Sequence, residues 1–560
     1  MPWLVAAIVT VAFLPSLGND FVLWDDDTNF LQNPAYRGLG LPQLRWMFTT
    51  FLLGHYVPVT WMTLGFDYVV WGMNPLGYHL TSLVLHVITT VVFFRIASRL
   101  LVKGGAGAAA PWGAGMAALL FGAHPLRVES VAWVTERRDV LSGLLYVTTV
   151  LVYLRACDHA ERRERWWRWY ALALVTFALA LLSKAMVVTL PLVLVILDVY
   201  PLRRLPPRPW TWRSRAAGAI LLEKVPFLAL AGAATGATIL AQGRYLHEFH
   251  GFGVVGRVAI ALYALAFYPW KTLLPVGLSP LYALPLRLAV FSWPYVLSTI
   301  VFVGVTIAAL RIGRRWAIVP CAWVAYVITL LPVSGIAHAG QQLAADRYSY
   351  LPSLPLSLLA GAAFAWLWQR WRRHAALGIV AAIVAATLAG LTAQQTRVWR
   401  DTESLWRAAL AVAPSANAHA YLADAILGDA ETAHPERLGE AEFHAVEAVR
   451  LNPSLGAARN VLGLVRIDQG RPAEAMEQFR NAIRIDPELP EPYNNLGILV
   501  GEQGRWAEAI QLYEEALRRD PTSAIALGNR EIAVVELLRQ HAAPGSAPRF
   551  TRAHPRARVN

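Results

Sequence analysis

Residues 375–393 have the sequence AALGIVAAIVAATLAGLTA, an apolar stretch without a charged side chain. A membrane-spanning helix needs about 20 apolar residues, so this stretch is long enough to cross a bilayer. Eleven further apolar stretches precede it, at residues 3–17, 79–102, 112–123, 140–156, 169–183, 185–200, 218–241, 258–275, 294–310, 316–333 and 351–368. The sequence therefore predicts a polytopic membrane protein of the all-α class.

The composition of the 560 residues excludes an ordinary soluble enzyme. Hydrophobic residues make up 56% of the chain and charged residues only 16%, whereas soluble domains carry about 25% charged residues. The net charge of +13 comes mostly from short loops between apolar stretches, a distribution that does not indicate nucleic-acid binding. The two cysteines, Cys157 and Cys321, are too few for a disulfide framework or a cysteine-based zinc site.

Basic loops predict the orientation of the chain, because cytoplasmic loops of membrane proteins are rich in Lys and Arg. We expect the four most basic loops to be cytoplasmic, at residues 162–165, 203–215, 311–315 and 370–373. Arginine supplies nearly all of the positive charge, which is typical of a GC-rich bacterial genome. The sequence therefore predicts a multi-pass protein of a bacterial inner membrane. The first apolar stretch has no cleavage site, so we expect it to be a retained helix.

The number of crossings follows from the same loops. Three apolar stretches separate the loop at 203–215 from the loop at 311–315, but two loops on one side need an even number of crossings between them. One of the stretches 218–241, 258–275 and 294–310 therefore does not cross. We favour 258–275 as a re-entrant or interfacial segment, because it contains Lys271 and precedes a Pro-rich region. About 11 spans remain, with a cytoplasmic N-terminus and an extracytoplasmic C-terminus.

The chain after residue 393 has the composition of a soluble domain and a period of 34 residues. The spacing relates Asn452-Pro453, Asp486-Pro487 and Asp520-Pro521, and also the pairs Leu462 and Leu496, Gly463 and Gly497, Phe479 and Tyr513, and Ala482 and Ala516. This pattern resembles the tetratricopeptide repeat, a helix-turn-helix unit that stacks into a solenoid. We expect about three and a half units in an extracytoplasmic domain over 394–541, including a degenerate unit at 414–452. A disordered basic tail is predicted over 542–560.

The predicted topology places three polar loops outside the cytoplasm, at residues 18–78, 124–139 and 334–350. The first contains three consecutive aspartates, Asp25 to Asp27, directly after a predicted membrane helix. Repulsion between neighbouring carboxylates raises the pKa of one of them, and such a group can act as a general base. Arginines can bind a phosphate by two parallel hydrogen bonds. These residues indicate transfer chemistry on a lipid phosphate, and a merely solvated acidic loop is the alternative.

Several stretches resemble the transmembrane and tetratricopeptide repeat-containing O-mannosyltransferase-like family, and they occur in the order found in that family. Residues that match its pattern in the amino-terminal part lie at 21–27, 33–34, 55–60, 67–68, 72, 75, 78–79 and 86. Those that match further along lie at 124–133, 137, 139, 182–184 and 346–352. The resemblance covers nearly the whole chain.

The resemblance implies a glycosyltransferase of the GT-C type, a multi-span enzyme that takes a sugar from a polyprenyl-phosphate carrier on the periplasmic or luminal side. Asp25 and Asp26 would then supply the base that deprotonates the acceptor hydroxyl, with inversion at the sugar carbon. Arg137 and Arg347 would bind the donor phosphate, with Lys184 as a weaker candidate. The other positions expected to shape or bind the substrate are Glu129, His124, Tyr56, His79 and Asp346.

The resemblance predicts no cofactor and no metal, although so many carboxylates make a divalent metal conceivable. His79 and His86 lie seven residues apart, on one face of a helix, and we expect interhelical hydrogen bonds from them rather than metal binding. Two departures from the family pattern matter. Asp27 obscures which carboxylate is the base, and Ala185 replaces a Glu common in animal members, which weakens the inference of mannose specificity.

The sequence thus predicts a GT-C-like transmembrane domain over 1–393 that transfers a sugar to a hydroxyl, with Ser or Thr of a protein as the expected acceptor. The repeats would hold the acceptor or a partner subunit. Two alternatives stay open. The chain could be a non-enzymatic membrane-anchored scaffold for envelope assembly, or a transporter of a polyprenyl-linked glycan, which would carry ionisable residues at mid-membrane depth.

Overall fold

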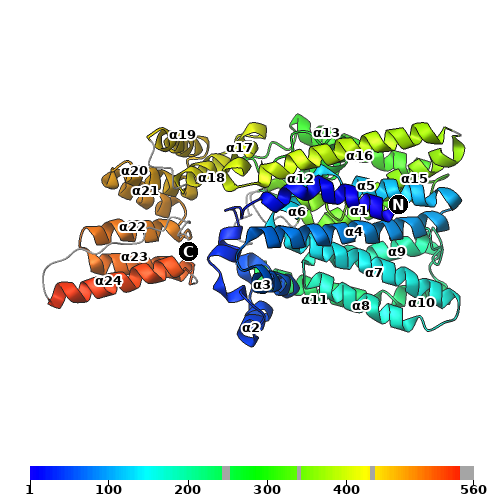
Figure 1. Ribbon diagram of the computed structural model, residues 1–560, viewed down its shortest axis with the longest axis horizontal. Helices are drawn as coiled ribbons and strands as arrows, with labels where there is room; N and C mark the ends of the chain where they lie inside the picture. The colour runs from blue at the N-terminus through cyan, green and yellow to red at the C-terminus, as the bar shows by residue number, and fades with distance from the viewer. Residues whose placement is uncertain (243–251, 337–341, 372, 429–434, 522, 543–560) are drawn as a thin grey trace. The chain divides into compact units, whose positions relative to one another are not determined.

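The computed structural model describes residues 1–242, 252–336, 342–371, 373–428, 435–521 and 523–542. Two compact units are present, residues 1–401 (unit 1) and 402–560 (unit 2) (Figure 1). The division falls after Asp401, whereas the sequence analysis placed it after residue 393, inside a helix that continues to Thr396. The tail predicted to be disordered lies outside the described residues from 543 onward.

Unit 1 is built from helices, which confirms the predicted all-α class. All twelve predicted apolar stretches are helical over most of their length. The helices are α1 (Pro2–Phe13), α2 (Leu41–Thr49), α3 (Pro58–Trp71), α4 (Pro75–Lys103), α5 (Ala110–Gly122), α6 (Val128–Ala132), α7 (Arg137–Glu161), α8 (Trp167–Leu181), α9 (Leu190–Val199), α10 (Arg215–Leu222), α11 (Val225–Gln242), α12 (Val254–Leu273), α13 (Trp293–Ile312), α14 (Ile318–Leu330), α15 (Ser353–Arg370) and α16 (His374–Thr396).

Five helices of the described chain are long and apolar enough to cross a membrane. They lie at Pro75–Lys103, Val134–Glu161, Arg215–Ala241, Trp293–Ile312 and His374–Trp399. Four shorter apolar helices accompany them, at Pro2–Gly18, Trp167–Leu181, Ala185–Val199 and Ile318–Val333. A polytopic membrane protein is confirmed by these helices, but the predicted number of about 11 spans is not.

Small residues allow close helix packing in unit 1, between α5 and α15. A Cβ atom added to Gly113 would lie 2.5 Å from the backbone oxygen of Gly361, and one added to Gly361 would lie 2.4 Å from the oxygen of Gly113. Apolar helices have no hydrophobic force to join them within lipid, so close backbone approach supplies the attraction. The two glycines are therefore required by the contact itself.

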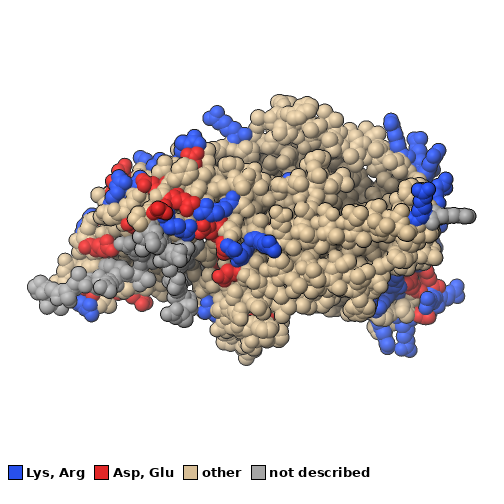
Figure 2. Space-filling view, turned by 45° about the horizontal axis from the view of Figure 1, so that its top comes forward, with Lys and Arg blue, Asp and Glu red and all other residues tan. Residues whose placement is uncertain are grey.

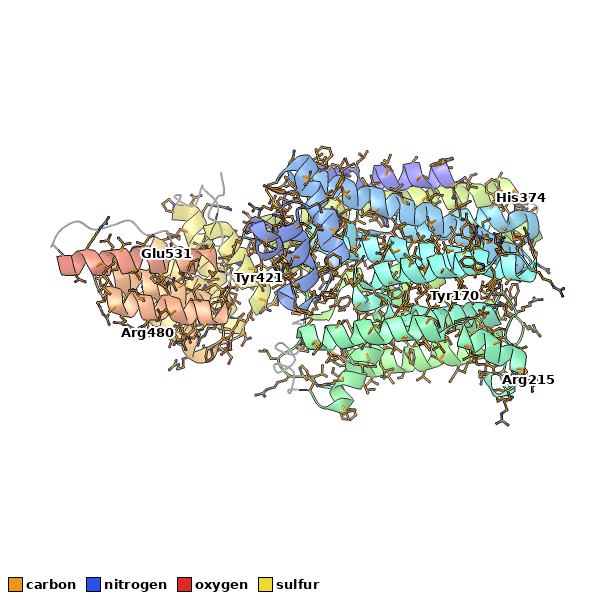
Figure 3. All side chains as sticks on the ribbon, turned by 90° about the horizontal axis from the view of Figure 1, so that it is seen from below. Tyr170, Arg215, His374, Tyr421, Arg480 and Glu531 are labelled. Atoms are coloured by element: carbon orange, nitrogen blue, oxygen red, sulfur yellow. The ribbon has the colours of Figure 1, made fainter. Side chains whose placement is uncertain are left out.

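Basic turns gather at one end of unit 1 (Figure 2). Figure 3 shows Arg215, at the start of α10, and His374, at the start of α16, at the same end. Tyr170, near the start of α8, donates a hydrogen bond of 2.7 Å to the backbone oxygen of Glu223, which follows α10. The turns before α8, α10 and α16 thus share one end, and its assignment to the cytoplasm stays a prediction.

A buried ionic network links α7, α9 and α10 in the same part of unit 1. The Tyr153 hydroxyl donates to Asp198 at 2.8 Å, and Asp198 also pairs with Lys224 at 2.7 Å and with Arg204 at 3.0 Å. Arg204 reaches Glu223 at 2.7 Å. The two acidic and two basic side chains neutralise one another and join the helices. This pairing argues against the transporter alternative, which requires ionisable groups that are free to bind a substrate.

Unit 2 begins with α17 (Thr402–Val412) and continues as α18 (Ala416–Leu427), α19 (Pro435–Leu451), α20 (Gly456–Asp468), α21 (Pro472–Ile485), α22 (Glu491–Glu502), α23 (Trp506–Arg519) and α24 (Ala524–Ala542). A Cβ atom on Gly463 would lie 2.4 Å from the ring of Phe479, and one on Gly497 would lie 2.7 Å from the ring of Tyr513. Each glycine therefore leaves the space that the aromatic ring of the following helix occupies. After α17, the pairs α18–α19, α20–α21 and α22–α23 and the final helix α24 follow the order expected for the predicted three and a half units.

Candidate active site

Asp26 joins two of the three predicted outer loops. Its carboxylate accepts hydrogen bonds from the backbone nitrogen of Val22 at 3.0 Å and from the backbone nitrogen and hydroxyl of Thr135 at 3.1 and 2.6 Å. The side chain is fully buried, and this burial raises the pKa of Asp26 to about 7 against the effect of the hydrogen bonds. These three hydrogen bonds hold the first predicted outer loop against Thr135 of the second.

Asp25 is half-buried and faces charged groups. Its electrostatic neighbours are Arg138, Arg347 and Glu136. Burial raises the pKa of Asp25 from its ordinary value, while the two arginines lower it. Of the two predicted catalytic aspartates, Asp25 is therefore the one placed beside cations that could hold a phosphate.

A cluster of three cations surrounds one carboxylate, that of Glu136, and we call it the cation cluster. Arg138 donates to Glu136 at 2.8 and 3.2 Å, the Lys184 ammonium at 2.7 Å, and the Arg347 Nε atom lies 3.2 Å from the same carboxylate. Lys184 also reaches Asp139 at 2.7 Å. The Glu136 side chain is fully buried, but Arg138 and Lys184 remain 12% and 15% exposed. An anion could approach the cluster through these two side chains.

Arg347 connects the third of the predicted outer loops to the second. Its guanidinium pairs with the Glu129 carboxylate, and its backbone nitrogen donates to the same carboxylate at 2.8 Å. Three stacked indoles lie beside it, with ring centroids 4.8 Å apart for Trp24 and Trp133 and 5.4 Å apart for Trp133 and Trp399. The Arg347 guanidinium is 5.4 Å from the Trp133 ring. Predicted residues Arg347, Glu129 and Lys184 thus meet near Asp25.

Arg137, which the sequence predicted to bind the donor phosphate, does not join the cation cluster. It forms a fully buried ion pair with Asp67 at 2.8 Å, and it donates to the Ser82 hydroxyl at 2.8 Å and to the Tyr78 backbone oxygen at 2.5 Å. These bonds hold α3, α4 and α7 together. The next residue, Arg138, supplies the accessible cation, because consecutive residues of a helix point in directions about 100° apart.

Tyr56, which was also predicted to bind the substrate, is bonded to a neighbouring segment. Its hydroxyl donates to the backbone oxygen of Phe48 at 3.2 Å. The preceding His55 has Arg138, Lys184, Glu136 and Arg347 as electrostatic neighbours. Burial, and then the nearby cations, hold the pKa of His55 well below its usual value. A neutral His55 therefore lies at the cation cluster, and its place in the motif at residues 55–60 was the available signal.

His124 caps a short helical turn rather than facing the cluster. Its Nδ1 atom accepts from the backbone nitrogen of Leu126 at 3.2 Å, while Nε2 lies 3.0 Å from the Thr272 oxygen. Burial lowers the pKa of His124 to about 3, consistent with a neutral ring. His79 is buried in α4 with Arg137 as its charged neighbour. His86 bonds Tyr350 at 2.8 Å and the Gly122 oxygen at 2.9 Å, as expected for an interhelical link.

Asp346 is buried where a two-stranded sheet brings distant segments together. Strand β1 (Tyr282–Ala283) pairs antiparallel with β2 (Gln342–Ala344). The Tyr282 hydroxyl consequently donates to Asp346 at 3.0 Å. Burial, with the charge of Glu129, raises the pKa of Asp346 well above its usual value, and Lys271 is a further charged neighbour. Neither Tyr282 nor Lys271 was predicted from sequence, because both belong to a region without a recognised motif.

The described residues contain no group of three or more His, Cys, Asp or Glu side chains placed to hold a metal ion.

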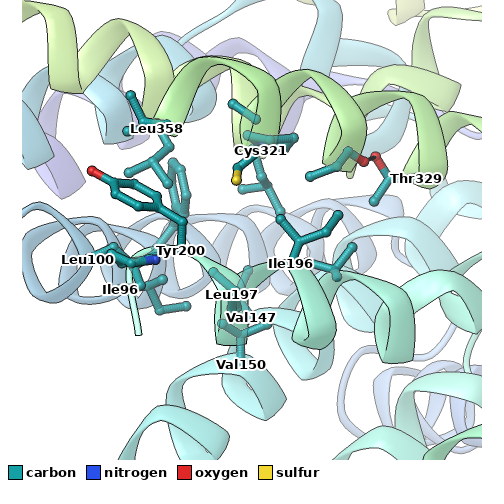
Figure 4. Close-up of a pocket in the computed structure, with 18 of the residues that line it drawn as sticks. Ile96, Leu100, Val147, Val150, Ile196, Leu197, Tyr200, Cys321, Thr329 and Leu358 are labelled. Atoms are coloured by element: carbon teal, nitrogen blue, oxygen red, sulfur yellow. Dashed lines mark hydrogen bonds between the residues drawn. The ribbon is translucent and has the colours of Figure 1, made fainter. Parts of the chain in front are cut away.

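An apolar pocket lies between α4, α7, α9, α14 and α15, with an empty volume of ≈830 Å³ (Figure 4). Tyr146, Tyr200, Cys321 and Thr329 supply polar atoms among side chains that are otherwise apolar. Leu351 lines the pocket and lies four residues after Arg347.

The fold and the three joined loops define a polytopic helical membrane protein that carries a tetratricopeptide unit. Family models described as "TPR repeat" and "Tetratricopeptide repeat" match residues 463–504 and 490–523. The chain is 28% identical over 212 residues to the mouse protein O-mannosyl-transferase TMTC2, covering 36% of this chain and 24% of that protein. It is 31% identical over 204 residues to the Drosophila melanogaster Tmtc2, covering 34% and 21%.

A longer similarity extends over most of the chain. The human protein O-mannosyl-transferase TMTC1 is 24% identical over 526 residues, which cover 83% of this chain and 56% of that protein. These similarities confirm the resemblance inferred from the motifs, although the chain spans only about a quarter of the length of the mouse relative. Among solved structures, ArnT from Cupriavidus metallidurans bound to undecaprenyl phosphate has a TM-score of 0.34 and 19% identity, covering 87% of this chain and 79% of that one.

Proposed function

We propose that this chain is an integral-membrane glycosyltransferase of the GT-C type. It transfers a sugar, mannose or another hexose, from a polyprenyl-phosphate carrier to a hydroxyl group of a protein outside the cytoplasm. One observation carries the proposal: the Asp25 carboxylate lies beside Arg138 and Arg347, two members of the cation cluster. A protein that only anchors the repeats in the membrane would not need a carboxylate of raised pKa beside accessible arginines that can bind a phosphate.

Asp25 acts as the general base. As the acceptor oxygen attacks the anomeric carbon, its proton passes to the Asp25 carboxylate and the bond from that carbon to the phosphate oxygen breaks. Direct attack inverts the configuration of the sugar. Burial raises the pKa of Asp25, which makes its carboxylate a stronger base. Asp26, held by Val22 and Thr135, fixes the loop that carries it.

The cation cluster stabilises the leaving phosphate. The donor is a phosphodiester with one negative charge, and departure of the sugar leaves a polyprenyl monophosphate that gains a second charge. Arg138, Lys184 and Arg347 converge on Glu136, while Lys184 is also paired with Asp139 and Arg347 with Glu129, so the acids hold the three cations in fixed positions. Preorganised cations aimed at developing charge lower the barrier because they need no reorganisation during the reaction.

A lipid carrier suits the apolar pocket. The pocket is lined almost entirely by hydrocarbon, and Leu351 connects it along the chain to Arg347. A polyprenyl tail could therefore rest in the membrane part while its phosphate reaches the cluster. The basic turns at the end of unit 1 where α7 terminates support an extracytoplasmic site, since cytoplasmic loops are the basic ones. The tetratricopeptide unit supports a peptide or protein acceptor, because such solenoids present extended concave surfaces.

Transfer by the purified full chain tests the proposal. The protein is reconstituted in lipid nanodiscs with polyprenyl-phosphate mannose or polyprenyl-phosphate glucose and a Ser/Thr-rich peptide. We expect the peptide to gain one hexose and polyprenyl phosphate to be released in equal amount. A chelator should leave the rate unchanged, because we propose a metal-independent reaction. If neither donor is consumed, and deletion of the gene instead mislocalises envelope proteins without altering their glycans, the scaffold alternative replaces this function.

A further inference from the structure

The turn between α7 and α8 combines a pocket with unpaired arginines. The pocket has an empty volume of ≈730 Å³ and is lined by His159, Glu164, Arg165, Arg168, Trp169 and Leu172. It lies at the far end of α7 from the cation cluster, since α7 begins at Arg137 and ends at Glu161. Its position follows a predicted membrane span, at the level where a bilayer becomes polar.

Positive charge is in excess at this turn. Asp158 pairs with Lys103 and with Arg99, Glu161 also pairs with Lys103 at 3.6 Å, and Glu164 in the pocket pairs with His159 at 2.5 Å. No carboxylate of the described chain lies within 4.0 Å of the arginines that follow, Arg162, Arg163, Arg165 and Arg168. All four are exposed. The neighbouring acids are thus already engaged, and the arginines stay available to an anion.

Aromatic rings line the same turn. The Arg155 guanidinium is 5.0 Å from the ring of Trp169, and His159 stacks on that ring at 5.8 Å. Trp166 and Trp167 are 39% and 57% exposed. Indoles in such positions prefer the headgroup level of a bilayer. The arginines are therefore held where phospholipid phosphates would lie.

An exposed apolar stripe leads away from the pocket along α8. Leu172 lines the pocket, and Val175 and Leu179 follow it on the same side of the helix at intervals of three and four residues. All three are more than one-third exposed. A phosphate pocket that continues into an apolar stripe matches a molecule with a charged head and hydrocarbon chains, and it does not match free phosphate.

We propose that the α7–α8 turn binds an anionic glycerophospholipid, with the phosphate between Arg165 and Arg168 and an acyl chain along Leu172, Val175 and Leu179. Basic pockets between membrane helices are known to select anionic headgroups. The site is separate from the proposed catalytic groups and does not depend on the proposed function.

Lipid binding to the purified full chain tests this site. The protein is titrated separately with phosphatidylglycerol, with phosphatidylcholine of the same acyl chains and with inorganic phosphate, and binding is measured by native mass spectrometry. The double variant Arg165→Gln/Arg168→Gln should weaken phosphatidylglycerol binding by about tenfold, since each cation near a membrane contributes measurably. The matched control Arg213→Gln/Arg215→Gln, in an exposed basic turn at the same end, should change it by less than twofold.

The outcomes separate the proposal from general surface attraction. Equal weakening in both double variants, or equally tight phosphatidylcholine binding, overturns it. Displacement of the lipid by millimolar inorganic phosphate assigns the pocket to free phosphate and also overturns it. An unchanged thermal unfolding midpoint in detergent establishes that both double variants fold. The variant Leu172→Ser/Val175→Ser should also weaken phosphatidylglycerol binding, because the acyl chain rests on the apolar stripe.

Discussion

Asp25 and Asp26 are adjacent in the chain, yet their surroundings give them different tasks. Asp26 accepts three hydrogen bonds from protein groups and is fully buried. Asp25 is half-buried and faces Arg138 and Arg347. The sequence alone does not separate their roles, because repulsion between neighbouring carboxylates acts on both. The hydrogen bonds from Val22 and Thr135 make the distinction.

The buried Asp26 predicts a pH dependence of stability. Its pKa rises from 3.8 to about 7 on folding, so the folded chain binds more protons than the unfolded chain between these values. Its contribution is complete below about pH 4 and is lost as the pH rises toward 7, with a slope of at most about 1.4 kcal/mol per pH unit. Thermal unfolding of detergent-solubilised protein at several pH values measures this. Asp26→Asn should flatten that part of the profile, and an unchanged profile in the variant contradicts the assignment.

Arg137 and Arg138 predict opposite phenotypes. Arg137→Gln leaves buried Asp67 without its partner, which should destabilise unit 1 by about 3–5 kcal/mol. Arg138→Gln removes a partly exposed cation from the cation cluster, so the thermal midpoint should change little while kcat/KM for the lipid donor falls about 10- to 100-fold. Unfolding midpoints and transfer rates of both variants provide the comparison. If Arg137→Gln instead lowers the transfer rate without changing the midpoint, and Arg138→Gln destabilises the protein, then Arg137 is the residue that binds the donor phosphate.

At the scale of elements, the sequence predicted helices far better than contacts. Apolar length and the 34-residue spacing are local signals, and every apolar stretch and repeat helix they indicated is present. The stretch 218–241 shows the limit, because Glu223 and Lys224 separate α10 from α11. Contacts such as Asp26 with Thr135, 109 residues apart, or Arg347 with Glu129, 218 residues apart, leave no periodic signal. The predicted topology placed those loops on one side of the membrane, and the family resemblance assigned their residues to one site.

The repeat packing predicts the effect of one methyl group. Gly463→Ala would bring its Cβ to 2.4 Å from the Phe479 ring, and such overpacking costs about 1–3 kcal/mol. Gly439→Ala is the matched control, because no atom lies within 4 Å of its added Cβ and it is exposed in α19. Alanine there should stabilise the helix by about 0.5–1 kcal/mol. Urea unfolding of unit 2 measures both, and a neutral Gly463→Ala would refute the proposed fit.

At the scale of the whole molecule, the division after Asp401 predicts that unit 2 folds alone. A fragment of residues 402–542 should have a helical circular dichroism spectrum and one cooperative thermal transition. Ending the fragment at Arg519 removes α24, whose Ala526 packs with Tyr493 and Ala516, so its midpoint should fall because apolar surface becomes exposed. A fragment 402–542 without a cooperative transition would show that unit 2 depends on unit 1.

The central claim is that Asp25 removes the acceptor proton beside the cation cluster. The most direct measurement is the initial rate of hexose transfer from polyprenyl-phosphate sugar to peptide by the Asp25→Asn variant in nanodiscs. Glu161→Gln, at the other end of α7, serves as the control. A general base contributes about 10²- to 10⁴-fold, so we expect a rate at least about 100-fold below that of the unaltered chain, with an unchanged thermal midpoint. A rate within twofold of the unaltered chain would contradict the account.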